Sequence, residues 1–100
     1  EVVPGENSDK PMVAVIPLNI DVQAILPIVG QLRRRGVRVE LELRGRKIGK
    51  AMGWADSIGA DYTFVVGPRD LEAGNGMLKS LSTGEQVAVA LDAESIVNSL

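Results

Sequence analysis

The sequence predicts a three-layer α/β/α domain built on a five-stranded mixed sheet. Strand-like apolar runs alternate with helix-like spacings along the first part of the chain, which is typical of strands that pair in parallel. Two strand-like segments joined by a short turn follow, and these are typical of an antiparallel hairpin. The length of 100 residues, of which 45% are hydrophobic, suits one domain with one core.

The composition excludes several classes of function. The chain has no Cys and no His, so it can form neither a disulfide nor a metal site of thiolate or imidazole ligands. Catalysis by a Ser–His or Cys–His pair is excluded too, and we assign no catalytic residue. No apolar run approaches the roughly 18–20 residues of a membrane helix, so we expect a cytoplasmic protein. Because the chain begins with Glu1 and not Met, we expect it to be part of a longer protein.

The chain opens with a polar segment and a buried strand. Residues 1–11 bring together Pro, Gly, Asn, Ser and Asp, which indicates a linker or a disordered arm. The domain itself is therefore expected at residues 12–100. Residues 12–18 form a continuous apolar run, which is typical of a strand buried on both faces.

Helical spacing follows over residues 22–35, with Asp21 as the expected N-cap and Gly36 after the last turn. Pro27 conflicts with an unbroken helix because it lacks an N–H group and its ring clashes with the preceding turn. Either the helix kinks at Pro27, or its regular part begins there.

The next three elements continue the alternation. Residues 37–43 alternate strictly between apolar and charged side chains, which predicts a strand near one edge of the sheet. Residues 46–58 have helical spacing and end at Gly59, and residues 62–66 form a second buried strand. The remaining predicted elements are a short connection with one helical turn, two strands and a final helix, at residues 68–74, 77–81, 86–91 and 93–100.

Connection lengths predict how these strands are arranged. The first three strands should be parallel, since helices connect them. The connection before the fourth strand is too short for a crossover, which predicts that this strand is antiparallel. Gly84 suits the turn between the last two strands, and Asp92 suits the N-cap of the final helix. The predicted strand order is 2-1-3-4-5.

Positive charge is concentrated in one segment, although the net charge is −2. Residues 33–50 have a net charge of +6 (8 minus 2), and the remainder has −8 (3 minus 11). The eight cations of this segment are Arg33, Arg34, Arg35, Arg38, Arg44, Arg46, Lys47 and Lys50. We expect them to lie on one rim of the sheet and to attract a polyanion. For residues 33–35 alone, the last turn of a helix is a sufficient explanation, because cations suit its dipole there.

The junction at residues 45–50, Gly-Arg-Lys-Ile-Gly-Lys, is a candidate anion site. It precedes a predicted helix, whose first N–H groups have no intrahelical partners and favour anions. Cations oppose the helix dipole at this end, which indicates a function rather than a structural role. The pattern predicts a site for phosphate or nucleic acid.

The sequence also resembles a known family. Residues 45–74 combine a Gly-Arg-rich helix start, a Trp-Ala-Asp stretch, an apolar strand ending in Gly, and an acidic turn. The segments VAVIPL at 13–18 and LSTGEQVAV at 81–89, with residues 32–40, complete an ordered set. This set resembles the C-terminal anticodon-binding domain of class II aminoacyl-tRNA synthetases, most of all histidyl-tRNA synthetase. It differs at residues 75–77, where Asn-Gly-Met replaces the usual Val-Thr-containing start of the fourth strand.

The resemblance implies a domain that binds the anticodon stem-loop of tRNA and has no cofactor of its own. It implies that ATP-dependent attachment of histidine to tRNA takes place in a separate catalytic domain, and that the parent enzyme is a homodimer. The residues implied to contact base edges are Asn19, Glu40 and Glu42, and those implied to contact the RNA backbone are Arg44, Arg46, Lys47 and Lys50.

Two other functions stay open at the level of sequence. The chain could be a regulatory or interaction module of a synthetase paralogue, or a flavodoxin-like domain that binds a small ligand at its strand ends. Salt-dependent binding of tRNA would distinguish an anticodon-binding domain from these two alternatives, because contacts to phosphates release counterions.

Overall fold

The central sheet has the order β2-β1-β3-β4-β5, which agrees with the expected order. It is seen in a computed structural model that describes residues 11–45 and 47–100. The elements, in chain order, are β1 (Met12–Pro17), the 3-10 helix η1 (Val22–Ala24), α2 (Leu26–Arg34), β2 (Arg38–Leu41), α3 (Ile48–Ser57), β3 (Tyr62–Val66), α4 (Pro68–Ala73), β4 (Asn75–Ser80), β5 (Gln86–Ala90) and α5 (Ala93–Asn98). Residues 1–10 of the predicted arm lie outside this description.

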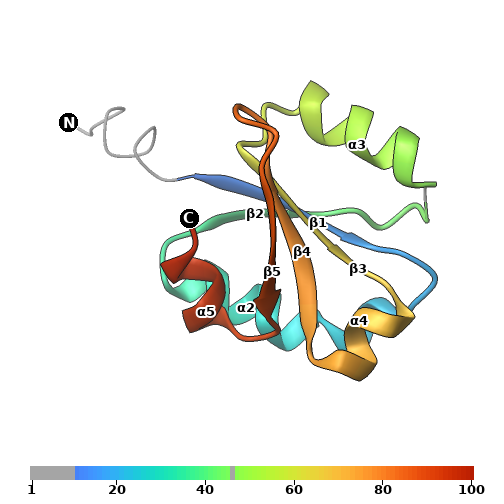
Figure 1. Ribbon diagram of the computed structural model, residues 1–100, viewed down its shortest axis with the longest axis vertical. Helices are drawn as coiled ribbons and strands as arrows, with labels where there is room; N and C mark the ends of the chain where they lie inside the picture. Colours follow the sequence, from blue (N-terminus) through green and yellow to red (C-terminus); the bar gives the residue numbers. More distant parts are fainter. Residues whose placement is uncertain (1–10, 46) are drawn as a thin grey trace.

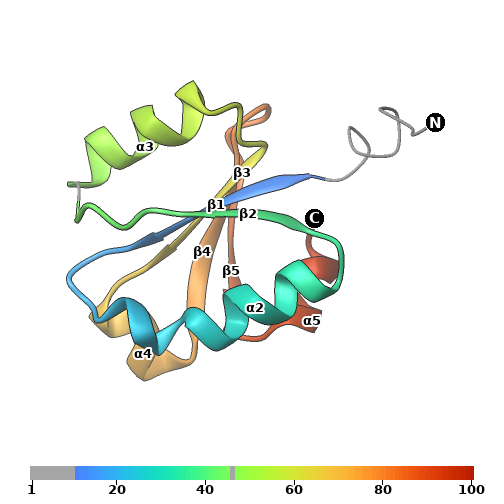
Figure 2. The same ribbon diagram turned by 180° about the vertical axis from the view of Figure 1, so that it is seen from behind.

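Strand directions also agree with the prediction. Strand β1 pairs in parallel with both β2 and β3, and β4 pairs antiparallel with β3 and with β5. Helix α3 lies on one side of the sheet, whereas α2 and α5 lie on the other (Figure 1). The view from behind shows the same three layers (Figure 2). Within the described ranges, no helix combines the length and the apolar character that crossing a membrane requires.

Most of the core lies between the sheet and the α2–α5 side. Val13, Phe64, Leu32 and Ile96 all belong to one buried cluster there. On the other side, α3 presents the fully buried Ala51 and Ala55. Small side chains on α3 let the helix pack close to the sheet.

The structure decides between the two alternatives at Pro27. A short 3-10 helix, η1, precedes α2, and Pro27 lies in the first turn of α2. An α-helix tolerates proline there because N–H groups of the first turn have no intrahelical acceptor. The helix is therefore not kinked by Pro27, and its regular part begins at Leu26.

The second predicted strand is shorter than its alternating pattern. Strand β2 ends at Leu41, whereas the pattern predicted a strand to residue 43. The Glu42 N–H still bonds to the Val15 carbonyl, at 2.9 Å, but the chain then turns away from the sheet. Leu43, which the pattern placed on the apolar face, is 71% exposed.

Strand β4 passes close to the ring of Phe64. A Cβ atom at Gly76 would lie 2.6 Å from Cζ of Phe64. The ring is buried in the core and cannot move aside without displacing its neighbours. Gly76, one of the residues at which the sequence departs from the family pattern, is therefore required by packing.

A matched pair of glycine substitutions tests this packing. Gly76→Ala should lower the free energy of unfolding by about 1–3 kcal/mol, because the added methyl group overpacks the core. Gly53→Ala adds the same group at an exposed site in α3, where the new methyl group meets no described atom within 4 Å apart from its chain neighbours and the adjacent backbone of its own helix. It should raise the free energy of unfolding by about 1 kcal/mol. Urea unfolding followed by circular dichroism measures both, and a Gly76→Ala protein as stable as the parent would contradict the packing argument.

The predicted cap of the last helix is present. The Asp92 carboxylate accepts hydrogen bonds from the Ser95 N–H, at 2.7 Å, and from the Ser95 hydroxyl, at 3.1 Å. These two bonds, with a smaller contribution from the Arg35 charge, hold the pKa of Asp92 below its ordinary value of 3.8. A lowered pKa means that protons bind the unfolded chain more readily than the folded one.

Stability should therefore fall in acid partly through Asp92. Its contribution is complete above the unfolded pKa near 3.8 and is lost as the pH falls through the lower folded value. Asp92→Asn retains a capping side chain without a titrating group. Melting temperatures measured between about pH 6 and pH 2 should fall less steeply for Asp92→Asn than for the parent protein. Parallel curves for the two proteins would contradict this assignment.

Candidate nucleic-acid interface

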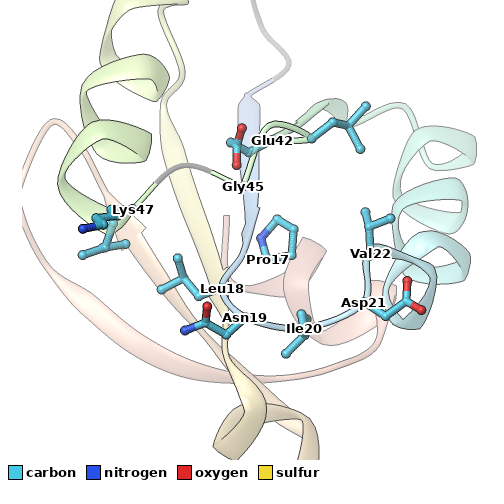
Figure 3. Close-up of a pocket in the computed structure, with 11 residues that line it drawn as sticks. Pro17, Leu18, Asn19, Ile20, Asp21, Val22, Glu42, Gly45 and Lys47 are labelled. Carbon is cyan, nitrogen blue, oxygen red and sulfur yellow. The ribbon is translucent and has the colours of Figure 1, made fainter.

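The carboxyl ends of β1 and β2 open onto a cleft of about 700 Å³ (Figure 3). Parallel strands bring the loops that follow them to the same edge of the sheet, and ligands of open α/β sheets bind at such edges. Three segments line the cleft: the loop after β1, the loop after β2 and the start of α3.

The loop after β1 is held by backbone and side-chain hydrogen bonds. The Leu18 N–H bonds to the Val66 carbonyl at 2.9 Å, which ties this loop to β3. Asn19 follows in a left-handed conformation with φ of 58°, and its side chain is exposed. Asn tolerates that conformation better than most residues. Asp21 then begins η1 by accepting the Gln23 N–H at 3.0 Å.

The loop after β2 is organised by a buried carboxylate. Glu42 is 1% exposed, and its Oε1 accepts the Arg44 N–H at 2.7 Å. This bond closes the turn that directs the chain from β2 toward α3. Gly45 follows with φ of 67°, a conformation that glycine adopts without strain. The carboxylate both lines the cleft and supports the loop.

The third segment is the N-terminus of α3. Lys47 is the N-cap residue of α3. Its side chain makes no capping hydrogen bond to the described residues. The first turn of α3 contains no acidic residue among those described. The first N–H groups of the helix therefore add to the positive charge of Lys47 and Lys50, both exposed. This end of the helix favours an anion.

The family follows from comparison with known proteins. The sequence profile of a family described as "Anticodon binding domain" matches residues 12–97. The chain belongs to the anticodon-binding domain family. The predicted resemblance, on which the expected site residues depend, is thereby confirmed.

Individual relatives agree with this assignment. A histidine–tRNA ligase of Pyrococcus abyssi is 42% identical over 82 residues, which cover 82% of this chain and 19% of that protein. The structure of apo histidyl-tRNA synthetase from S. aureus matches with a TM-score of 0.77 and 26% identity, over 88% of this chain and 26% of that one. Prolyl-tRNA synthetase from Cryptosporidium parvum shares the fold, with a TM-score of 0.76 and 22% identity, over 87% and 20% of the two chains. The anticodon-binding domain thus spans about a fifth of the length of the curated relatives it matches.

The structure gathers some of the predicted site residues of this anticodon-binding domain and not others. Asn19, Glu42 and Lys47 line the cleft. Arg44 and Lys50 are exposed on the loop and helix beside it. Glu40 is exposed on β2, two residues before Glu42, and is not in the cleft lining. Arg46 lies outside the described residues.

The expectation of a single positive rim is wrong. Arg33 to Arg35 end α2 and Arg38 begins β2, so these cations lie at the amino end of the strand. Arg44, Lys47 and Lys50 follow its carboxyl end. The four residues of β2 alone span roughly 13 Å at about 3.3 Å per residue, more than the Debye length of about 8 Å. The two groups of cations therefore act separately.

The cations at the amino end also have structural roles. The Arg33 guanidinium donates to the Val39 carbonyl at 3.0 Å, and Arg35 contributes to the lowered pKa of Asp92. Helix α2 connects the carboxyl end of β1 to the amino end of β2. Its last turn therefore lies at the end of the sheet opposite to the cleft. Among the described cations of residues 33–50, Arg44, Lys47 and Lys50 remain near the predicted site.

Several residues that line the cleft of the domain were not among the predicted site residues. Asp21 was assigned only as a cap, yet it also lines the cleft. Leu18, Ile20, Val22 and Ile48 supply apolar walls. Their position immediately after a strand or at a helix start was the available signal, because loops at carboxyl ends line such sites. The cleft is therefore lined by both polar and apolar side chains. The surface beside it, at the start of α3, is positively charged.

Proposed function

We propose that this domain recognises the anticodon loop of a histidine tRNA, as a non-catalytic part of a histidine–tRNA ligase. One observation supports it most directly: a cleft lined by Asn19 and Glu42 lies beside the cations Lys47, Lys50 and Arg44. The family and the names of the curated relatives support the choice of RNA and of amino acid. The domain itself needs no cofactor for this function.

The cleft and its neighbouring cations suit different parts of an RNA loop. Phosphates are bound by cations and by N–H groups at a helix N-terminus, which supply affinity but little sequence discrimination. Unpaired bases can leave the stack and be recognised at their edges by amide and carboxylate groups. Lys47, Lys50, Arg44 and Arg46 are therefore assigned to the backbone, and Asn19, Glu42 and Glu40 to base edges.

The size of the cleft is compatible with this role. A volume of about 700 Å³ lies within the range of about 300–1,000 Å³ typical of pockets for small ligands. A single unstacked nucleotide is a ligand of that class. The apolar side chains of Leu18 and Ile48 are available for contact with a base plane, and the polar groups of Asn19 and Glu42 for contact with its edge.

The remaining partners follow from the same proposal. The anticodon stem-loop binds here, and the attachment of histidine with ATP takes place in the catalytic domain of the parent enzyme, a homodimer of the cytoplasm. A synthetase paralogue with a regulatory role would share the fold and fail to bind tRNA. A flavodoxin-like ligand domain would use the same cleft without any dependence on RNA.

Charge reversal at Lys47 tests the backbone contacts. Lys47→Glu should weaken binding of a histidine tRNA and reduce the slope of log affinity against log salt by about 1, as expected for a lost phosphate contact. By its place in the sequence, Arg46→Glu should act similarly. Arg34→Glu is the control, since it makes the same charge change at the exposed end of α2. Filter binding at several salt concentrations measures all three, and equal losses for Lys47→Glu and Arg34→Glu would remove Lys47 from the interface.

Base recognition is tested separately with anticodon stem-loops. We compare a loop with the histidine anticodon GUG with one of shuffled sequence. Glu42→Gln retains an acceptor for the Arg44 N–H and should reduce the preference for GUG, by about 1–3 kcal/mol if one base contact is lost. Asn19→Ala should reduce the same preference, and Glu40→Gln measures whether recognition extends along β2. A preference unchanged by both Glu42→Gln and Asn19→Ala would exclude this cleft as the reading site.

A further inference from the structure

The two edges of the sheet differ in their protection. At the β2 edge, the Arg38 and Glu42 N–H groups point inward, to the Pro11 and Val15 carbonyls. Because adjacent residues of a strand alternate, the N–H and carbonyl groups of Val39 therefore point away from the sheet. Its carbonyl accepts a hydrogen bond from Arg33, and charged Arg38 and Glu40 flank it. Charge along an edge strand opposes pairing with another chain.

Strand β5 forms the opposite edge and presents outward backbone groups that bond to no other strand in the described part of the chain. The Ser80 N–H bonds to the Glu85 carbonyl at 2.9 Å, and the Leu91 N–H bonds to the Gly74 carbonyl at 3.0 Å. In an antiparallel pair the inward-pointing residues alternate, so residues 85, 87, 89 and 91 face β4. The N–H and carbonyl groups of Gln86, Ala88 and Ala90 then point away from the sheet. The Ala90 carbonyl accepts the Asp92 N–H at 2.8 Å. In the part of the chain that the structure describes, no strand pairs with this edge.

Two common protections of an edge strand are absent from β5. Its sequence, Gln-Val-Ala-Val-Ala, contains neither a charged residue nor proline. Val87 is 52% exposed. Such an edge is a template for pairing with a further strand.

We propose that β5 pairs antiparallel with β5 of a second copy of this chain, about a two-fold axis at Ala88. This register makes the outward groups of Ala88 meet those of Ala88 in the second copy. It also brings Gln86 opposite Ala90 of the second copy, and Ala90 opposite its Gln86. Every outward N–H and carbonyl group of the strand then has a partner in the second copy, and the Ala90 carbonyl accepts this bond in addition to that from the Asp92 N–H. One continuous sheet then crosses both copies.

Side chains along this register are self-complementary. Val87 lies opposite Val89 of the second copy, on the side of the sheet covered by α2 and α5, so the exposed Val87 gains an apolar neighbour. Glu85 lies opposite Leu91 of the second copy, and Asp92 opposite its Gly84. No acid therefore faces an acid, and a two-fold interface needs this kind of self-complementarity.

A single pair of short strands buries little surface, so the dimer should be weak and dependent on concentration. It should also be compatible with tRNA binding, because the cleft lies after β1 and β2, beside the opposite edge. An extended segment of a different protein could use the same backbone groups. If β5 pairs with a different protein instead, the purified chain should remain monomeric. A monomeric chain would therefore contradict the proposal.

Substitutions at Ala88 test the proposal by sedimentation velocity of the purified chain from micromolar to millimolar concentration. Ala88→Pro removes the outward N–H group, which makes no bond within the sheet, and an edge strand tolerates proline at such a position. Ala88→Val is the matched control, because it retains the N–H group and favours a strand. Val87→Lys is a second variant, which places a charge opposite Val89 of the second copy without disturbing a buried side chain.

The parent protein and Ala88→Val should dimerise with rising concentration, whereas Ala88→Pro and Val87→Lys should stay monomeric with an unchanged circular dichroism spectrum. Amide exchange at residues 86, 88 and 90 should slow with rising concentration in the parent and in Ala88→Val, but not in the two monomeric variants. A parent protein that is monomeric at millimolar concentration would overturn the proposal. A dimer that persists in folded Val87→Lys and Ala88→Pro would overturn it too, since another surface would then form the contact.

Discussion

Parallel pairing of β1 with its two neighbours decides where the chemistry of this domain lies. Parallel strands need crossover helices, and each crossover returns the chain to the amino end of the sheet before the next strand begins. The loops after β1 and β2 consequently meet at one edge, and they bring Asn19 and Glu42 together although the sequence separates them widely. The same geometry places the start of α3 at that edge. The cleft is thus a consequence of topology before any side chain is considered.

The Glu42 carboxylate affects both its own stability as a buried charge and the path of the chain after β2. Burying a charged group is costly unless hydrogen bonds compensate it, and the bond from the Arg44 N–H supplies part of this compensation. The bond also ends β2 early, which exposes Leu43 and directs the chain to the N-cap of α3. The hydrogen bond of the Glu42 carboxylate therefore helps to determine the conformation of the loop that positions Arg44 and Lys47.

Much of the fold could be predicted because the determining signals are local. Asp92 is recognisable as a cap from its place before a helical spacing, and the short connection before β4 excludes a parallel crossover. The position of positive charge could not be predicted in this way. Arg35 and Arg44 are close in sequence, yet β2 runs between them and separates them to opposite ends of the sheet. Asp21 shows the converse limit, because a side chain recognised as a cap can also line a cleft formed by a distant loop.

The asymmetry of the two sheet edges follows from the same topology. The β2 edge borders the end of α2, so Arg33 can reach around it and bond to the Val39 carbonyl. The β5 edge follows a tight turn, and the strand itself contains no charged residue. Because these edges lie on opposite sides of the sheet, association through β5 would extend the sheet away from the cleft. Each copy would then keep its own cleft, proposed above to bind RNA, and the two clefts would be held apart by the width of the joined sheet.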